Sequence, residues 1–411
     1  MAEFTPDVDP AAVGLDARRL SRIDAHLRRY LDEGKLAGCQ VMVSRHGKVA
    51  HLSSLGLADL ETGRPVETDT LWRIYSMTKP VTSVAAMMLW EEGAFELTDP
   101  VSRWLPEFAA PRVYVGGPAA KPVTVPATEP IRVWHLLTHT AGLTYGFHKV
   151  HVTDELHRLK GFEVGVPPGL DLAGCVRAWA EIPLSFQPGA EWNYSVATDV
   201  LGRLVEVVSG QSLDTFFAER IFKPLGMTDT AFWCPEDKHG RLAALYAAAP
   251  SARRPVRMDT VGEAFKRPPT WLSGGGGLVS STRDYTRFTW MLLNGGELDG
   301  ARLLSPRTLD YMTVNHLPGG ADLATFGRPL FAETRFDGVG FGLGFAVVLD
   351  PVAYRTLSSV GEYQWGGMAS TAFWVDPVEQ LSVVFMTQLM PSSAYPLRSQ
   401  LRQLVYQALV D

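Results

Sequence analysis

The segment that decides the fold is LWRIYSMTKP, residues 71–80, which leads into a predicted helix. Ser76 and Lys79 are three residues apart, a spacing that puts both side chains on one helical face. Pro80 has no N–H and is tolerated in the first turn of a helix, so the helix begins near Ser76. The residue before a proline is biased away from helical geometry, and we therefore expect local strain at Lys79.

This pair can support nucleophilic chemistry. A serine at a helix N-terminus lies beside unpaired N–H groups and the positive end of the helix dipole, which favour an alkoxide or an oxyanion. A neutral Lys79 amine can take the Ser76 proton, or a charged one can lower the pKa of a neighbouring base. Alone, the pair is weak evidence, because a capping serine beside a surface lysine has the same spacing.

Two later segments supply candidate partners. In QPGAEWNYS, residues 187–195, Tyr194 precedes a predicted helix. A phenol beside a lysine ammonium has its phenolate favoured and can act as a general base toward Ser76. In EYQWGGM, residues 362–368, Gly366 and Gly367 let the backbone approach a ligand, and an edge strand there could offer an N–H to a carbonyl oxygen. Taken singly, these segments also fit a packed loop tyrosine and a turn that enters a strand.

Hydrophobic periodicity gives the organisation of the chain. Helical spacing predicts helices over residues 15–33, 78–92, 131–137, 196–209, 213–221, 282–293 and 396–410. Strand-like runs cover residues 38–44, 49–56, 342–349, 370–376 and 381–388, and a hairpin turn is expected at 46–48. The proline-containing stretch 113–130 is expected to be a surface loop.

The order of these elements predicts an α+β fold. Consecutive strands joined by short turns pair antiparallel, so the economical architecture is one antiparallel sheet, built from both chain ends and flanked by helices. Residues 1–95 and 275–411 would form this sheet domain, and residues 96–274 an inserted, mostly helical domain.

Composition excludes several classes of protein. The chain has 411 residues, with 38 Lys plus Arg against 44 Asp plus Glu and a formal net charge of -6. This mild acidity argues against a nucleic-acid binder, which shows a clustered basic face. No run reaches the roughly 18 apolar residues of a membrane helix. We therefore expect neither nucleic acid nor a membrane as a partner; the oligomeric state stays open.

The cysteines and the first residues bear on the compartment. Cys39, Cys175 and Cys234 are odd in number, far apart and without a Cys-x-x-Cys pair, so neither a disulfide framework nor a thiolate metal site is expected. The first residues are acidic and lack the apolar core of a secretory signal. These features predict free thiols and a cytoplasmic location.

Other patterns are discounted. His135 and His139 have the spacing of a helical zinc pair, but no His-Glu-x-x-His arrangement or third ligand accompanies them. We expect His139 to be a buried hydrogen-bonding group and no metal to bind. The glycines at 274–277 lack the Lys-Ser/Thr of a phosphate loop and are expected to let the chain cross beneath the site. No Gly-x-Ser-x-Gly elbow is present, which argues against an α/β-hydrolase.

Taken together, the motifs resemble a known superfamily. Ser76-x-x-Lys79, Tyr194-Ser195 and a glycine-rich strand near the C-terminus, in this order, are similar to the serine β-lactamases and penicillin-binding proteins. Connecting segments typical of the class C branch are LWRIY at 71–75, LLTHTAGL at 136–143, PLGM at 224–227 and GGGLVSST at 275–282. The resemblance covers nearly the whole chain, from about residue 15 onward.

Two departures identify the branch. Class C lactamases have Tyr-x-Asn, but Val196 stands at the third position here and has no carboxamide. They also have a strand Lys-Thr-Gly that binds the β-lactam carboxylate, whereas this chain has Trp365-Gly366-Gly367, with neither charge nor hydroxyl. The combination resembles the family VIII carboxylesterases, and statin-type acyltransferases are near relatives by motif.

The resemblance implies a mechanism and a set of residues. Ser76 would be the nucleophile of a double displacement on a neutral, short-chain ester, and Tyr194 beside Lys79 would move its proton. Backbone N–H groups of Ser76 and Met368 would form the oxyanion hole, and no metal or organic cofactor is implied. Candidate walls of the substrate pocket, placed by proximity to the motifs, are Trp365, Gly366, Gly367, Tyr145, Phe147, Trp192 and Phe341.

Other functions remain open on the same scaffold. A β-lactamase, a peptidase, an amide hydrolase or an acyltransferase would use the same acyl-enzyme. A member that only binds a small molecule is a more remote alternative, because Ser76, Lys79 and Tyr194 are all present. Acyl-chain preference cannot be derived from the sequence.

Overall fold

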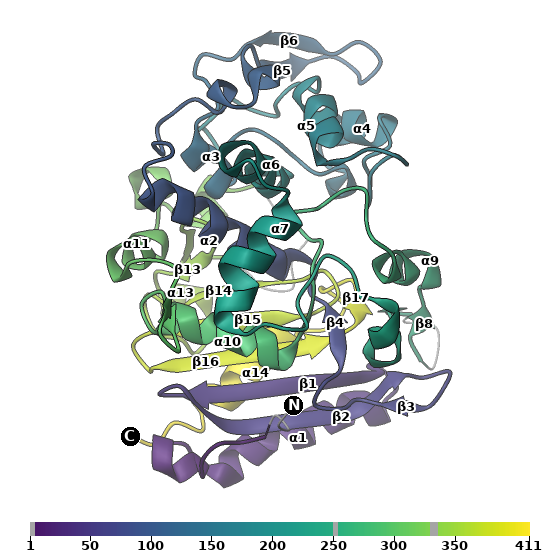
Figure 1. The fold of residues 1–411 in the computed structure, drawn as a ribbon, viewed down its shortest axis with the longest axis vertical. Helices are drawn as coiled ribbons and strands as arrows, with labels where there is room; N and C mark the ends of the chain where they lie inside the picture. Colours follow the sequence, from purple (N-terminus) through teal and green to yellow (C-terminus); the bar gives the residue numbers. More distant parts are fainter. Residues whose placement is uncertain (1–4, 250–253, 329–335) are drawn as a thin grey trace.

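An eight-stranded antiparallel sheet joins the two ends of the chain in this computed structural model (Figure 1). The structure describes residues 5–249, 254–328 and 336–411, so residues 1–4 and 329–335 of the expected sheet domain and residues 250–253 of the expected helical domain lie outside the described part. The strands follow the order β12-β13-β14-β15-β16-β1-β2-β3. Their bounds are β1 Gly38–Arg45, β2 Lys48–Asp59, β3 Arg64–Pro65, β12 Val339–Phe341, β13 Ala346–Val348, β14 Tyr363–Gly366, β15 Ala372–Asp376 and β16 Leu381–Thr387.

The pairing of β1 with β16 joins the N-terminal and C-terminal strands. Its register runs from Cys39 opposite Thr387 to Arg45 opposite Leu381. Every residue of both strands is buried, as expected for a sheet that has both faces covered. The turn between β1 and β2 uses positive φ at His46 and Gly47, which allows the tight hairpin expected at 46–48.

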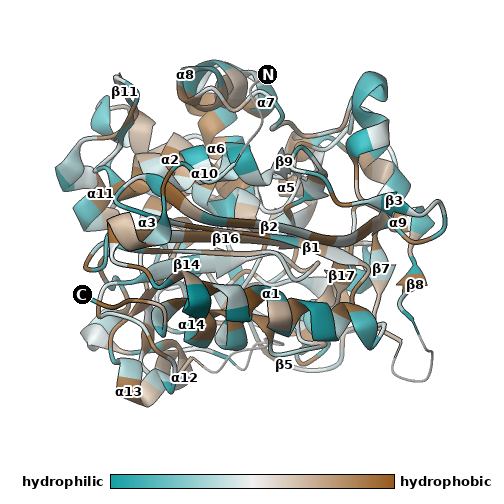
Figure 2. Ribbon diagram, turned by 90° about the horizontal axis from the view of Figure 1, so that it is seen from below, coloured by the Kyte–Doolittle hydropathy of each residue, from teal (hydrophilic) through white to brown (hydrophobic). Residues whose placement is uncertain are grey.

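Helices cover both faces of the sheet. Helices α1, Ala17–Asp32, and α14, Leu397–Tyr406, lie on one face, and α10, Thr282–Leu293, lies on the other, with α2, Thr78–Glu91, and α6, Ala197–Ser209, beyond it (Figure 2). Helix α1 buries one apolar stripe, whereas nearly all of α2 is buried. An apolar helix surface on all sides is typical of a helix inside a core, so α2 anchors its N-terminus rigidly.

The remaining elements are short. The other helices are α3 Val133–Leu137, α4 Val152–Leu159, α5 Leu172–Ala180, α7 Leu213–Phe217, α8 Lys223–Leu225, α9 Asp259–Gly262, α11 Pro306–Met312, α12 Leu323–Phe326 and α13 Pro351–Tyr354. The other strands are β4 Leu71–Arg73, β5 Arg112–Gly116, β6 Val123–Pro126, β7 Tyr246–Ala247, β8 Val256–Arg257, β9 Val279–Ser281, β10 Glu297–Leu298, β11 Ala301–Arg302 and β17 Leu389–Met390.

The two expected domains share a core. The largest cluster of buried apolar side chains runs from the sheet through α2 into the segment 96–274; Phe373, Val84, Leu136 and Val200 all belong to it. The division at residues 95 and 274 therefore stays a prediction about chain organisation, and the packing across it is continuous.

The expected surface loop at 113–130 is wrong in part. Strands β5 and β6 form a hairpin there, which projects from the molecule at the top of Figure 1. Val113 is buried and Val115, two positions further on, is 54% exposed, so the strand does not alternate regularly; its register shifts between Tyr114 and Gly116. Pro118 and Pro122 lie in the connection between the two strands, and the prolines led to the expectation of a loop.

The segment 362–368 is also more regular than expected. It contains β14, which pairs with β13 and with β15 and is therefore an interior strand instead of a turn or an edge. Only Tyr363 and Gln364 pair with β13; Trp365 and Gly366 extend past it and pair with β15 alone among the described strands. One side of the glycine-rich end is thus left without a neighbouring strand.

The described residues contain no helix that combines the length and the apolar character required to span a membrane.

Candidate active site

Ser76 lies in a 3-10 turn, Tyr75–Met77, that leads directly into α2. Tyr75 has a φ of 44°, a left-handed conformation that is rare for a bulky residue. Lys79 is an ordinary residue of α2, with Pro80 next to it in the first turn. The expectation of strain at Lys79 is therefore wrong by four residues; the strain lies at Tyr75, directly before the serine, where it turns the chain into the helix.

Lys79 is at the centre of the site. Its side chain is buried, and its Nζ donates to the Gly275 carbonyl at 2.7 Å, the Tyr145 hydroxyl at 3.1 Å and the Ser76 hydroxyl at 3.3 Å. An ammonium group has three donors, so this set uses all of them. The contact between Ser76 and Lys79 that the spacing predicts is present.

Tyr194 covers the lysine with its ring. Lys79 Nζ lies 4.5 Å from the centre of this ring, a cation–π distance. The Tyr194 hydroxyl accepts a hydrogen bond from the indole N–H of Trp365 at 3.4 Å, and its backbone carbonyl pairs with His148 Nε2 at 2.7 Å. Tyr194 and Trp365, which are 171 positions apart, therefore form one wall beside Lys79.

Tyr145 has a closer contact than the sequence suggested. Proximity to a motif made it a candidate pocket wall, and its hydroxyl instead bonds directly to Lys79. Burial first, and then the charge of Asp199, raise the pKa of Tyr145 well above that of a free tyrosine. This phenol therefore stays protonated at neutral pH. Its ring stacks on Phe147 with centroids 4.6 Å apart.

The glycine-rich end of β14 lies against the turn that contains Ser76. A Cβ on Gly367 would lie 2.4 Å from the Ile74 carbonyl oxygen, so no side chain fits there. The Gly367 amide donates to the Thr371 carbonyl at 2.9 Å, and the Thr371 hydroxyl to Ile74 at 3.3 Å. Met368 follows directly, which keeps the proposed pair of oxyanion amides, Ser76 and Met368, a geometrically reasonable prediction.

A layer of buried rings supports Tyr194 from behind. His139 Nδ1 lies 3.2 Å from Ser195 Oγ, and its ring contacts Trp192, Tyr194 and Phe341. Burial first, and then the Lys79 cation, hold the pKa of His139 well below its usual range. The imidazole is therefore neutral, as its expected hydrogen-bonding role requires.

The candidate pocket walls fall into two groups. Trp192 and Phe341 are each only 1% exposed, so they pack behind the wall and do not face a ligand. Phe147 is 36% exposed and Trp365 is half-buried, so these two side chains are accessible to a substrate. Substrate contact stays a prediction for all of these residues.

The sequence did not single out Asp199. This residue lies in the first turn of α6, is 1% exposed, and accepts hydrogen bonds from Ser273 Oγ at 2.6 Å and from the Gly275 amide at 3.1 Å. The glycine segment 274–277 crosses beside Lys79 as expected, and the Gly275 carbonyl is the lysine's shortest contact. An aspartate five positions after Tyr194, in an otherwise apolar helix start, was the available signal.

Comparison with known proteins identifies the family. A family model described as Beta-lactamase matches residues 23–407. The chain belongs to the Beta-lactamase family.

Proteins similar to this chain include an esterase. Esterase EstB of Burkholderia gladioli is 35% identical, over 97% of this chain and 98% of its own. Protein Rv1367c of Mycobacterium tuberculosis is 38% identical over 89% of both chains. The solved structure of EstCE1, described as a hydrolase with promiscuous acyltransferase activity, has a TM-score of 0.80 at 29% identity and covers 95% of this chain and 99% of that one.

These findings confirm the α+β fold and the resemblance to the esterase branch of the superfamily. The chain is a serine hydrolase of the β-lactamase fold. The comparisons do not test which of its residues are catalytic, so those roles stay predictions.

The histidine pair of this β-lactamase-fold protein has other partners. His135 Nδ1 accepts the Arg132 amide at 3.0 Å at the start of α3, and His139 faces Ser195. No group of three or more histidine, cysteine, aspartate or glutamate side chains in the described ranges is arranged to hold a metal ion.

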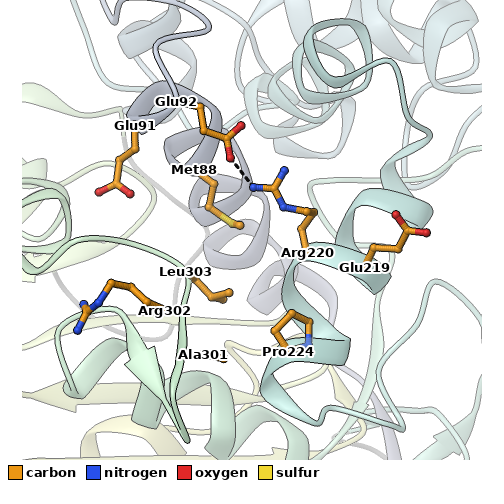
Figure 3. Close-up of a pocket in the computed structure, with 9 residues that line it drawn as sticks. All are labelled: Met88, Glu91, Glu92, Glu219, Arg220, Pro224, Ala301, Arg302 and Leu303. Carbon is orange, nitrogen blue, oxygen red and sulfur yellow. Dashed lines mark hydrogen bonds and ion pairs between the residues drawn. The ribbon is translucent and has the colours of Figure 1, made fainter.

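A cavity of about 490 Å³ lies away from the Ser76 cluster, between the end of α2, the segment before α8, and β11 (Figure 3). Arg220 and Glu92 form an ion pair across it. None of its lining residues belongs to the group formed by Ser76, Lys79, Tyr145 and Tyr194. They are Met88, Glu91, Glu92, Glu219, Arg220, Pro224, Ala301, Arg302 and Leu303.

Proposed function

We propose that this protein is a serine carboxylesterase that hydrolyses neutral, short-chain esters through a covalent acyl-enzyme on Ser76. The observation that supports this most strongly is the nature of the wall around the nucleophile. A half-buried indole, Trp365, occupies the strand position where class C lactamases have a cation. Ser76 and Lys79 remain in contact beside it. The similarity to Esterase EstB adds support.

In the first half of the proposed reaction, Ser76 Oγ attacks the ester carbonyl and its proton passes to the Tyr194 phenolate. Lys79 Nζ lies 4.5 Å from the centre of the Tyr194 ring and the Trp365 N–H donates to the Tyr194 oxygen, so both groups lie beside the proposed proton acceptor. The developing oxyanion is bound by the amides of Ser76 and Met368. When the tetrahedral intermediate collapses, Tyr194 returns the proton to the leaving alcohol.

In the second half, water attacks the acyl group, Tyr194 accepts one of its protons, and the acid leaves as Ser76 regains its hydroxyl proton. The Tyr194 hydroxyl accepts the Trp365 N–H, and the proposed path requires a movement of its ring toward Ser76 when a substrate binds, because catalytic hydrogen bonds often tighten only in the substrate complex.

An acyltransferase is the second candidate. EstCE1, the structural neighbour with a TM-score of 0.80, is described as a hydrolase with promiscuous acyltransferase activity. The chemistry differs only in the second step, where an alcohol replaces water as the acceptor of the acyl group.

One experiment tests both candidates. The purified protein is incubated with p-nitrophenyl esters of graded chain length and with a chromogenic cephalosporin, with and without an added alcohol. We expect free acid as the main product, a preference for short neutral esters, and no turnover by Ser76→Ala. Ester formed with the alcohol in excess over acid would favour the acyltransferase, and a cephalosporin preference would contradict the esterase.

A further inference from the structure

Lys79 is a buried cation without a carboxylate in direct contact. Its three hydrogen-bond acceptors, Gly275, Tyr145 and Ser76, are neutral groups. No ion pair in the described ranges includes this lysine. A buried ammonium with no counter-charge tends to lose its proton. A nearby carboxylate would offset the cost of burying this charge.

Asp199 is a buried carboxylate that shares Gly275 with Lys79. Its two hydrogen-bond donors, Ser273 and Gly275, come from the segment that also offers the Gly275 carbonyl to Lys79. A Cβ added to Gly275 would lie 2.4 Å from Asp199 Oδ2 and 3.1 Å from the Tyr145 hydroxyl. The carboxylate, the phenol and the lysine acceptor therefore surround one glycine Cα.

We propose that Asp199 is a positioning residue whose carboxylate is the counter-charge of Lys79, held one peptide unit away by Gly275. This inference rests on the proposed function. Asp199 keeps Lys79 as an ammonium, and Lys79 then acts as the electrostatic partner of Tyr194 and not as the base. Burial raises the pKa of Asp199, and three contacts oppose this and favour the ionised carboxylate: the Lys79 charge and the hydrogen bonds from Ser273 and Gly275, both of which go to Oδ1.

The Asp199 carboxylate acts on one of the two tyrosines that contact Lys79, which are Tyr145 and Tyr194. Burial and the charge of Asp199 raise the pKa of Tyr145, so Tyr145 remains a hydrogen-bonding phenol. Tyr194 contacts Lys79 through its ring face and has the indole N–H of Trp365 on its oxygen. The proposal therefore assigns proton transfer to Tyr194 and the holding of Lys79 to Tyr145.

A purely structural role is the alternative. Asp199 is in the first turn of α6, where a negative charge stabilises any helix, and its hydrogen bonds shape the 273–277 segment. An asparagine would preserve an acceptor for Ser273 and Gly275 and remove only the charge. The two roles therefore predict different results for Asp199→Asn.

Several titratable groups face this cluster, and they bear on a pH profile. They are Lys79 of α2, Cys175 of α5, His139 after α3, Tyr145 and His148 of the following loop, and Tyr194 before α6. Burial first, and then Asp199, raise the pKa of the Cys175 thiol to about 12. Burial lowers the pKa of His139 and of His148. None of these three groups gains or loses charge on the alkaline side of neutral pH.

The test is kcat and KM of Asp199→Asn with a p-nitrophenyl ester over about pH 5 to 10. We expect kcat to fall by about 10-fold or more while KM changes by less than about 2-fold. The alkaline limb of the kcat profile should move to lower pH by about one unit, because a nearby charge shifts a titration by one to three units. Wild-type kcat with an unmoved profile would overturn the proposal.

Asp284→Asn is the matched control. Asp284 in α10 is also a buried aspartate that accepts one backbone amide, from Asp229 at 2.7 Å, and one hydroxyl, from Thr230 at 2.9 Å. It makes no contact with Lys79, so its variant should retain the wild-type pH profile. A profile that moves equally in both variants would mean that buried Asn substitution itself perturbs the site, and would overturn the charge argument.

A second variant covers the case in which Asp199→Asn does not fold. Gly275→Ala retains every charge and pushes the new Cβ against Asp199 Oδ2, so the alkaline limb should again move to lower pH. A wild-type profile for Gly275→Ala would overturn the proposal. Failure of the proposed function looks different, because the wild-type protein itself would then hydrolyse no ester.

Discussion

On the lysine side of the site, polar groups saturate one another: Lys79 uses all its donors on Gly275, Tyr145 and Ser76. On the tryptophan side, Trp365 and Tyr194 lie on a layer of buried rings that includes a neutral His139. The Lys79 ammonium belongs to the first side. On the second side Trp365 and Tyr194 present aromatic surface, and the Arg398 guanidinium behind Gly366 donates to the Gly367 and Thr371 carbonyls. Such a division suits attack on a neutral carbonyl.

The largest expected effect comes from removing the nucleophile on the lysine side. Ser76→Ala should lower ester turnover by about 10³-fold or more, because no acyl-enzyme can form. Its free energy of unfolding should change by only ~1 kcal/mol, the usual size of one hydroxyl at a helix start. Intact-mass spectra after organophosphate treatment should show one adduct on the wild-type protein and none on the variant; an adduct on the variant would exclude Ser76.

The next effect tests whether the two sides act as one unit. Lys79→Ala and Tyr194→Phe should each lower kcat by ~10²-fold or more, since each removes part of one proton-transfer path. The double variant should be far less than multiplicatively worse. Steady-state measurement of kcat for all three variants on one ester tests this expectation. Fully multiplicative losses of kcat would show that Lys79 and Tyr194 work independently.

Local spacing predicted the part of the site that local geometry controls. Ser76 and Lys79 meet because a helix brings residues three apart together, and Pro80 fixes where that helix starts. The order of motifs along the chain, read as a resemblance, supplied Tyr194 and the strand with Trp365. Their contact was not predictable from either segment alone, because it depends on how β14 meets the loop before α6.

The missed features all depend on long-range packing or on backbone conformation. The bond from Lys79 to Tyr145 spans 66 positions, and the bond from Ser273 to Asp199 spans 74. No periodicity signals either. The strain at Tyr75 was not predicted because the rule for a residue before proline pointed to Lys79, four positions later.

The third prediction concerns Trp365→Lys, which replaces the indole on the tryptophan side with a cation. A strand cation makes a charge-assisted contact with a β-lactam carboxylate that is worth ~1.5–3 kcal/mol, or roughly 10- to 150-fold. A neutral ester does not need this contact and also gains apolar contact with the indole face. From both contributions we expect the wild-type protein to favour a short neutral ester over any penicillin or cephalosporin by at least ~100-fold in kcat/KM. Trp365→Lys should narrow this ratio, chiefly by lowering ester turnover, because Tyr194 also loses its indole N–H.

Trp365→Phe is the matched control for that substitution. It retains an apolar aromatic ring without adding a charge, and removes the N–H that Tyr194 accepts together with part of the ring area of the indole. Ester turnover should fall, and β-lactam turnover should not rise. Efficient penicillin hydrolysis by the wild-type protein, comparable with ester hydrolysis, would contradict this account of the tryptophan side.

The smallest effect concerns stability in acid, where two buried histidines away from the aromatic wall destabilise the folded protein. Burial lowers the pKa of His135 and of His157 to about 4, from an unfolded value near 6.5. Between pH 4 and pH 6.5 these histidines are protonated in the unfolded chain and neutral in the folded protein. Stability is therefore retained above pH ~6.5 and lost as pH falls toward 4, by up to ~1.4 kcal/mol per pH unit for each histidine.

Denaturant unfolding at several pH values should show this slope of the unfolding free energy against pH, and His157→Gln should flatten it. His46→Asn, at an exposed hairpin turn with positive φ, should leave the slope unchanged. An equal flattening in both variants would show that the buried position of His157 is not the cause.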